Sequence, residues 1–207
     1  MLELLPKSSA REFSRGSVIY PPHRPQANLY LVMAGRVKVS TTPSEGETVC
    51  RLVFKGGLFG EPALIRAPNR SDTAVALEAV RLMSWTASEI DEQVDLNPRL
   101  GLVLCQYLVK QCLDLMDRMQ SLVRYDTPKR LMLVLIEIAR SAGVEMPDGA
   151  TRVEPLTHQI LSECVGTSRE VVTFQLNRLR SLGFIRYSRQ YMDVSVPQLE
   201  AGLRAGK

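Results

Sequence analysis

The sequence of 207 residues has little of what several protein classes require. No apolar run approaches the ~20 residues that span a membrane. The first residues lack a basic segment followed by a long apolar core, so we expect no signal peptide. Four cysteines without C-x-x-C spacing argue against a disulfide framework and a zinc site. We therefore expect a cytoplasmic protein without a metal. No nucleophile–base pair indicates an enzyme.

The composition permits a packed core, because 45% of the residues are hydrophobic. The length allows one large domain or two small ones. The net charge of +4 divides into +3 for residues 1–90, −2 for 91–150 and +3 for 151–207. This excess is too small to identify a nucleic-acid-binding protein by charge alone.

Residues 156–185 predict two short helices that meet at Gly166, the pattern of a helix-turn-helix. One face of this segment is apolar, with Val165, Val172, Leu176 and Leu179 at helical spacing. The other carries hydrogen-bonding side chains, namely Arg169, Thr173, Asn177 and Arg180. The alternative is an ordinary helical hairpin with a solvated polar face, because helix-turn-helix patterns match many unrelated sequences.

The second helix is predicted to read DNA in the major groove. Thr167 and Glu170 resemble a capping box, so this helix should begin at Ser168. Arg169 can pair with guanine, whereas Glu170 either accepts from cytosine or serves only the cap. Phe174 either packs in the core or reaches a thymine methyl group. Phosphate contacts that position the helix are expected from Thr157 and Ser168.

Two short strands, 184–187 and 191–196, are predicted around residues 188–190 and would form a winged hairpin after the helix-turn-helix. Residues 143–153 are predicted to be a polar loop. The first part of the chain alternates short β-rich runs with turn residues, which indicates a closed or sandwiched antiparallel fold. The predicted strands are 17–20, 28–34, 36–41, 48–54, 73–77 and 80–84.

Residues 57–71 interrupt these strands with glycines, a carboxylate and an arginine. A short helix after Gly60 would direct backbone N–H groups at an anion. Arg70 could then neutralise a phosphate, and Glu61 could accept a hydrogen bond from a ribose hydroxyl. Alternatively, Glu61 and Arg70 form an ion pair in a surface loop.

A short capped helix over 88–95 precedes a long helix over 99–124, and residues 125–128 separate that helix from another over 129–141. Two series with seven-residue spacing make an apolar seam suited to a parallel helix pair. The alternatives are a helix packed only on its own domain and, for Cys105 and Cys112, an intersubunit disulfide. The predicted seam consists of Cys105, Leu108, Cys112, Leu115, Met119 and Leu122.

Three stretches resemble the cyclic-AMP-receptor/fumarate-nitrate-regulator (CRP/FNR) family: VGTSREVVTFQLNRL with GFI, LYLVMAGRVKV, and GLFGEPALI followed by NRS. The resemblance implies an α+β fold with a cyclic-nucleotide-binding β-roll (jelly roll) over 1–95. A dimerisation helix over 96–126 and a winged helix-turn-helix over 127–207 would follow. It implies that Gly60 and Glu61 hold a ribose, and that Arg70 and Ser71 hold a cyclic phosphate.

The same resemblance implies a homodimer on a near-palindromic operator, with RNA polymerase as a further partner. The effector would be a cyclic nucleotide such as cyclic AMP, cyclic GMP or cyclic di-GMP. It would act through the dimer helix and a hinge at 126–128. However, Leu115 and Met116 stand where cyclic-AMP-responsive members offer hydroxyls to adenine, and neither side chain forms useful hydrogen bonds. A constitutive DNA-binding regulator is therefore the alternative.

Overall fold

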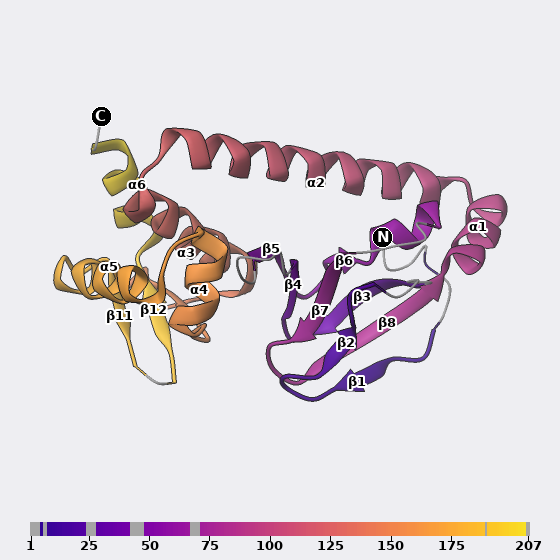
Figure 1. Ribbon diagram of the computed structural model, residues 1–207, viewed down its shortest axis with the longest axis horizontal. Helices are drawn as coiled ribbons and strands as arrows, with labels where there is room; N and C mark the ends of the chain where they lie inside the picture. Colours follow the sequence, from indigo (N-terminus) through magenta and orange to yellow (C-terminus); the bar gives the residue numbers. More distant parts are fainter. Residues whose placement is uncertain are drawn as a thin grey trace. The chain divides into compact units, whose positions relative to one another are not determined.

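A computed structural model describes residues 5, 8–23, 28–41, 48–66, 71–188 and 190–205. The chain forms two compact units, Met1–Arg118 and Met119–Lys207. The first is rich in strands, and the second combines helices with a small sheet (Figure 1). The bounds of the three domains expected from the sequence remain a prediction.

The first unit is a roll of two four-stranded antiparallel sheets, ordered β1-β8-β3-β6 and β2-β7-β4-β5. All six predicted strands are present within about two residues of their expected ends. Strands β1 and β6 were not predicted from the sequence. The strands are β1 Arg11–Phe13, β2 Val18–Tyr20, β3 Asn28–Ala34, β4 Val37–Thr41, β5 Thr48–Val53, β6 Leu58–Phe59, β7 Asp72–Ala76 and β8 Val80–Thr86.

The alternation of side chains over 28–34 predicts a half-buried strand with one face inward. This prediction is wrong for β3, which is buried on both faces. Tyr30 and Val32 pack in the core between the two sheets. Leu29 and Leu31 lie in a second core with Trp85, formed where helices cover the sheet. Alternation of side chains therefore reports two buried surfaces here, because helices cover the side that the sequence pattern assigned to solvent.

Those helices are α1, Ala87–Leu96, and the beginning of α2, Arg99–Arg124. Thr86 caps α1 by accepting a hydrogen bond from the backbone N–H of Glu89, whose carboxylate accepts in return from the Thr86 N–H. This reciprocal capping box fixes where α1 begins. Leu100 and Leu104 of α2 are buried in the second core, so the first turns of α2 are fixed to the roll.

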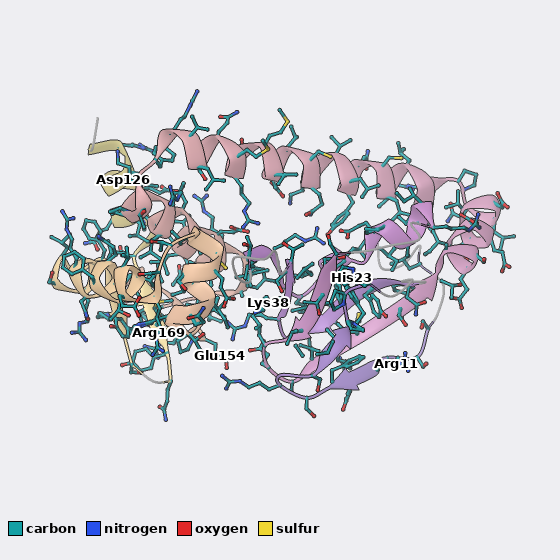
Figure 2. All side chains as sticks on the ribbon, in the orientation of Figure 1. Arg11, His23, Lys38, Asp126, Glu154 and Arg169 are labelled. Atoms are coloured by element: carbon teal, nitrogen blue, oxygen red, sulfur yellow. The ribbon has the colours of Figure 1, made fainter. Side chains whose placement is uncertain are left out.

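Two residues, Tyr125 and Asp126, separate the end of α2 from α3, Thr127–Ala142. Asp126, at the junction of α2 and α3, caps α3 by accepting from the N–H of Lys129, and Pro128 lies in its first turn (Figure 2). Arg130 donates to the carbonyl of Tyr125, at 3.2 Å, and to the carbonyl of Val165, also at 3.2 Å. The predicted break between the helices is confirmed.

The remainder of the second unit comprises α4, α5 and α6 around a four-stranded sheet ordered β11-β12-β10-β9. The polar loop expected over 143–153 is wrong, because it contains two strands of this sheet; α6 was not predicted. The elements are α4 His158–Val165, α5 Arg169–Ser181, α6 Val196–Ala205, β9 Val144–Glu145, β10 Thr151–Val153, β11 Ile185–Tyr187 and β12 Met192–Val194.

No helix among the described residues is long and apolar enough to cross a membrane. Within the same residues, no group of three or more His, Cys, Asp or Glu side chains is arranged to hold a metal ion. Cys105, Cys112 and Cys164 form no disulfide bond within the described part of the chain.

Candidate functional site

The turn between α4 and α5 has the geometry expected from its sequence. Thr157 caps α4 by accepting from the N–H of Ile160. Gly166 ends α4 in the left-handed region, at φ 70°, where a residue with a Cβ would be strained. Val165, Val172, Leu176 and Leu179 are all buried, which confirms the predicted apolar face.

The start of α5 lies one residue later than predicted. Ser168 caps the helix by accepting from the N–H of Val171, at 3.3 Å, so the expected cap at Thr167 is wrong. Hydrogen bonds from the backbone N–H of Glu170 and from the Ser168 hydroxyl hold the pKa of the Glu170 carboxyl below its ordinary value. Glu170 therefore remains an ionised partner of the cap, and its carboxylate is exposed.

Of the four residues predicted to form the polar face of α5, only Asn177 lies directly opposite the buried stripe. At 100° per residue, the direction opposite the buried stripe is occupied by Glu170, Phe174, Asn177 and Ser181. Arg169, labelled in Figure 2, lies exposed in the first turn. Thr173 is only half-buried and donates to the Arg169 carbonyl, at 2.8 Å.

Contacts tie α5 to α4 and to the β11–β12 hairpin. The hydroxyl of Tyr187 on β11 donates to Asn177 Oδ1, at 3.2 Å, and Arg180 lies over the Tyr187 ring, at 5.3 Å. His158 of α4 lies 2.8 Å from the Thr173 hydroxyl. Burial lowers the pKa of His158, and the positive charge of Arg169 lowers it further. The predicted DNA-facing residues Thr173 and Asn177 thus also hold this surface together.

The hairpin is fixed to the sheet by a buried carboxylate that the sequence analysis did not single out. Asp193 of β12 lies opposite Arg152 of β10 and Arg186 of β11 in the two strand registers. Arg152 donates to both carboxylate oxygens, at 2.6 and 2.9 Å, and Arg186 donates at 3.3 Å. A local sequence signal was absent because only the strand pairing brings these three residues together.

Asp193 gives the second unit a defined acid sensitivity. Hydrogen bonds from Arg152 lower the pKa of the Asp193 carboxyl below its ordinary value. The unfolded chain therefore binds this proton more readily, so the stabilisation is present above about pH 4 and is lost as the pH falls through the lower folded-state pKa. We expect Asp193→Asn to lower the melting temperature at pH 7 and to reduce its dependence on pH below 4.

Thermal unfolding followed by circular dichroism between pH 3 and pH 7 measures both effects. Glu145→Gln, which removes an exposed carboxylate from β9 of the same sheet, is the matched control. Equal melting curves for Asp193→Asn and the wild type would contradict the stabilising role of Asp193.

The polar corner of the roll follows β6. Gly60 has φ 91°, and a Cβ there would lie 2.6 Å from the Asn28 carbonyl oxygen, so only glycine fits. Glu61 begins a 3-10 helix, Glu61–Ile65. Ser71 is exposed just before β7, and Arg70 lies outside the described residues. The structure therefore describes Gly60 and Glu61, which are predicted to hold the ribose, but not Arg70, which is predicted to hold the phosphate.

Arg51 of β5 is the main residue of this corner that sequence reasoning missed. Its guanidinium forms an ion pair with Glu61, at 2.8 Å, and donates to the Leu58 carbonyl, at 3.0 Å. It also donates to the side chain of Gln111 on α2, at 2.6 Å. Nothing in the local sequence joins a strand arginine to these partners, which come together only in the folded roll.

A second link between the corner and α2 runs through Tyr107. Its hydroxyl donates to the Leu58 carbonyl, at 2.9 Å, and accepts from the Leu58 N–H, at 3.0 Å. Burial raises the pKa of the Tyr107 phenol, so this hydroxyl stays protonated at neutral pH. Arg51 and Tyr107 therefore connect strands β5 and β6 of the corner to two successive turns of α2.

The other side of α2 is apolar and exposed. In the predicted seam, Cys105 and Cys112 are exposed, and the leucines and methionine are 36% to 60% exposed. Side chains with sulfur atoms project from this helix in Figure 2. A further row of apolar residues at seven-residue spacing was not predicted, and its residues are 56% to 88% exposed. That row consists of Leu102, Val109, Met116 and Val123.

Comparison with known proteins agrees with both halves of this arrangement. The family described as "Cyclic nucleotide-binding domain" matches residues 10–97, and the "Crp-like helix-turn-helix domain" matches residues 129–201. The chain is 30% identical over 199 residues to a global nitrogen regulator of Synechocystis, which covers 94% of this chain and 88% of the relative. The chain belongs to the CRP/FNR family.

Two further proteins match most of the chain. Transcriptional regulator SdrP of Thermus thermophilus is 31% identical, over 84% of this chain and 83% of the relative. The crystal structure of a CRP/FNR-family regulator, also from Thermus thermophilus, is 27% identical, with a TM-score of 0.77, over 95% of this chain and 98% of that one. The protein is thus a transcription regulator with a DNA-binding helix-turn-helix, not an enzyme.

Proposed function

We propose that this CRP/FNR regulator is a homodimer that binds a near-palindromic operator and whose affinity for DNA is set by an effector in the corner of the roll. Gly60, Glu61, Arg70 and Ser71 would form the effector site, with a cyclic nucleotide as the ligand class. Once bound to DNA, the dimer would act on RNA polymerase. The single observation that carries regulation by this route is the contact of Arg51 with both Glu61 and Gln111.

The exposed apolar face of α2 supports the dimer. A helix whose apolar stripe lacks cover in a single chain needs a partner, and seven-residue spacing suits a parallel copy of the same helix. A two-fold dimer presents two identical recognition helices, so its operator should contain two related half-sites about one helical turn apart.

Arg51 supports coupling between the corner and this face. A ligand hydroxyl that donates a hydrogen bond to the Glu61 carboxylate must share that carboxylate with Arg51 or displace Arg51 from it. Because the same guanidinium holds Gln111, either event changes how the roll holds α2. Allosteric coupling requires such a differential contact in the bound and free states.

The alternative, a constitutive regulator without an effector, also has a specific observation in its favour. Glu61 already forms an ion pair with Arg51 within the chain, so this carboxylate has a cationic partner without a ligand. Leu115 and Met116 are exposed and offer no hydrogen bonds to a base.

One titration separates these two functions. Duplexes selected by the purified protein from a randomised library are titrated by fluorescence anisotropy with and without cyclic AMP, cyclic GMP or cyclic di-GMP. An effector-controlled regulator should change its affinity about 5- to 150-fold with one of them. Tight specific binding that none of them changes would favour the constitutive regulator, and absence of specific binding would refute both.

For the effector-controlled regulator we expect Arg51→Met to reduce the nucleotide-induced change in DNA affinity to about twofold or less. Methionine retains much of the apolar length but cannot donate to Glu61 or Gln111. Calorimetry should still detect nucleotide binding, because the other predicted ligand residues remain. Arg11→Met, an exposed arginine of β1, is the matched control. An undiminished response in Arg51→Met would exclude this coupling route.

A further inference from the structure

Phe174 is an exposed aromatic residue in the middle of α5. Its side chain is 65% exposed, whereas Val172 and Leu176, two residues to either side, are at most 2% exposed. At 100° per residue, this spacing places Phe174 opposite the buried stripe. The structure therefore excludes the first of the two roles considered for Phe174, packing in the core.

The exposed surface of α5 around Phe174 is mostly polar, and three of the four charged residues of this helix are arginines. Glu170 and Asn177, one turn away on either side, are exposed. Arg169, Arg178 and Arg180 are also exposed on α5. Glu170 is the only acidic residue of this helix. A ring exposed among arginines fits a partner that is anionic at its edges and apolar within, which describes the major groove of DNA where it contains thymine methyl groups.

The hydrogen bond between Tyr187 and Asn177 fixes α5 near its middle to the β11–β12 hairpin. It holds the helix one turn after Phe174 to the β11–β12 hairpin, at 3.2 Å. Phe174 thus lies between the first turn, with Arg169, and a segment fixed to the wing. The backbone of Phe174 is therefore held in place on both sides, while its side chain remains exposed.

We propose that Phe174 is a specificity-determining residue that reads the C5-methyl group of a thymine in each operator half-site. This inference rests on the proposed binding of a two-half-site operator. Phe174 follows Arg169 by five positions, a rise of about 7.5 Å along the helix. With base pairs about 3.4 Å apart, the thymine lies roughly two base pairs from the base that Arg169 contacts.

The decisive probe is an operator in which deoxyuridine replaces thymine at one symmetric pair of positions, which removes only the methyl groups. Burying one such group is worth about a fourfold change in affinity, so two half-sites together should lose roughly 16-fold. The same replacement at thymines elsewhere in the half-site should change the affinity less than twofold.

Variants of Phe174 assign the effect to this residue. Phe174→Ala should bind thymine and deoxyuridine operators equally, whereas Phe174→Leu, which retains an apolar side chain, should still prefer thymine. Replacing the thymine–adenine pair by 5-methylcytosine–guanine should restore part of the wild-type affinity relative to unmethylated cytosine. Melting temperatures verify that each variant is folded.

Each outcome has one meaning. Methyl dependence that disappears in Phe174→Ala supports the inference. If the wild type binds its selected operator but no deoxyuridine replacement matters, or if Phe174→Ala keeps the full methyl dependence, the inference is overturned while the proposed function stands. If the wild type selects no operator, the proposed function itself fails.

Discussion

Met119→Glu is expected to turn the protein into a monomer and to weaken operator binding by about 10²- to 10⁴-fold, the range over which linking two binding modules raises affinity. Met119 is 60% exposed on α2 and belongs to the predicted seam, in the seven-residue series that also contains Cys105 and Cys112. In a symmetric dimer the substitution would place two carboxylates in an apolar contact. Ionised groups without partners are costly to bury there.

Sedimentation equilibrium measures the dimer, and fluorescence anisotropy with the selected operator measures DNA binding. Gln106→Glu adds the same charge to α2 at an exposed position outside the predicted seam and outside the row that contains Leu102 and Val109. This variant should remain dimeric. Unchanged helical content and melting of the second unit would show that Met119→Glu is folded. A dimeric Met119→Glu protein with wild-type affinity would place the subunit contact elsewhere.

Arg169→Ala is expected to weaken operator binding by about 5- to 150-fold for each half-site, the equivalent of about 1–3 kcal/mol for a bidentate arginine–guanine pair. Both half-sites lose the contact together, so the loss for the whole operator is larger still. Arg169 is exposed in the first turn of α5, directly after the cap at Ser168. The base preference should relax at one position of the half-site while other positions stay selective.

Competition titrations with operators permuted at each position test this expectation. Arg178→Ala is the control, because it removes the same charge from an exposed site on the same helix. If Arg178 contacts only phosphate, it should weaken all sequences equally and lower the salt dependence by about one ion. Equal behaviour of the two variants on every permuted operator would mean that Arg169 does not read a base.

Much of the fold was predictable because local signals coincide with it. Helix α2 has the predicted ends, since Pro98 stands before its start and Asp126 with Pro128 prevents its continuation. The helix-turn-helix was predictable for the same reason, with Gly166 supplying the left-handed turn. The one-residue error at Thr167 arose because a neighbouring serine can form the same cap.

What the sequence did not predict depends on contacts between distant segments. The pattern of β3 did not reveal that helices cover its second face, because alternation alone does not distinguish one apolar surface from two. Arg51 meets Glu61 and Gln111 only through strand register and the packing of α2. Phe174 was ambiguous because an aromatic residue in a helix is compatible with either surface until the buried stripe is located.

The short connection between α2 and α3 has a kinematic consequence. Only Tyr125 and Asp126 separate Arg124 from Thr127, so the joint contains about four soft backbone torsions, two for each residue. Arg130 restrains one side of it by binding the Tyr125 carbonyl. Inserting a single residue would add two torsions and lengthen the joint by up to about 3.6 Å. Unlike most surface connections, this one should therefore tolerate substitution far better than any change in length.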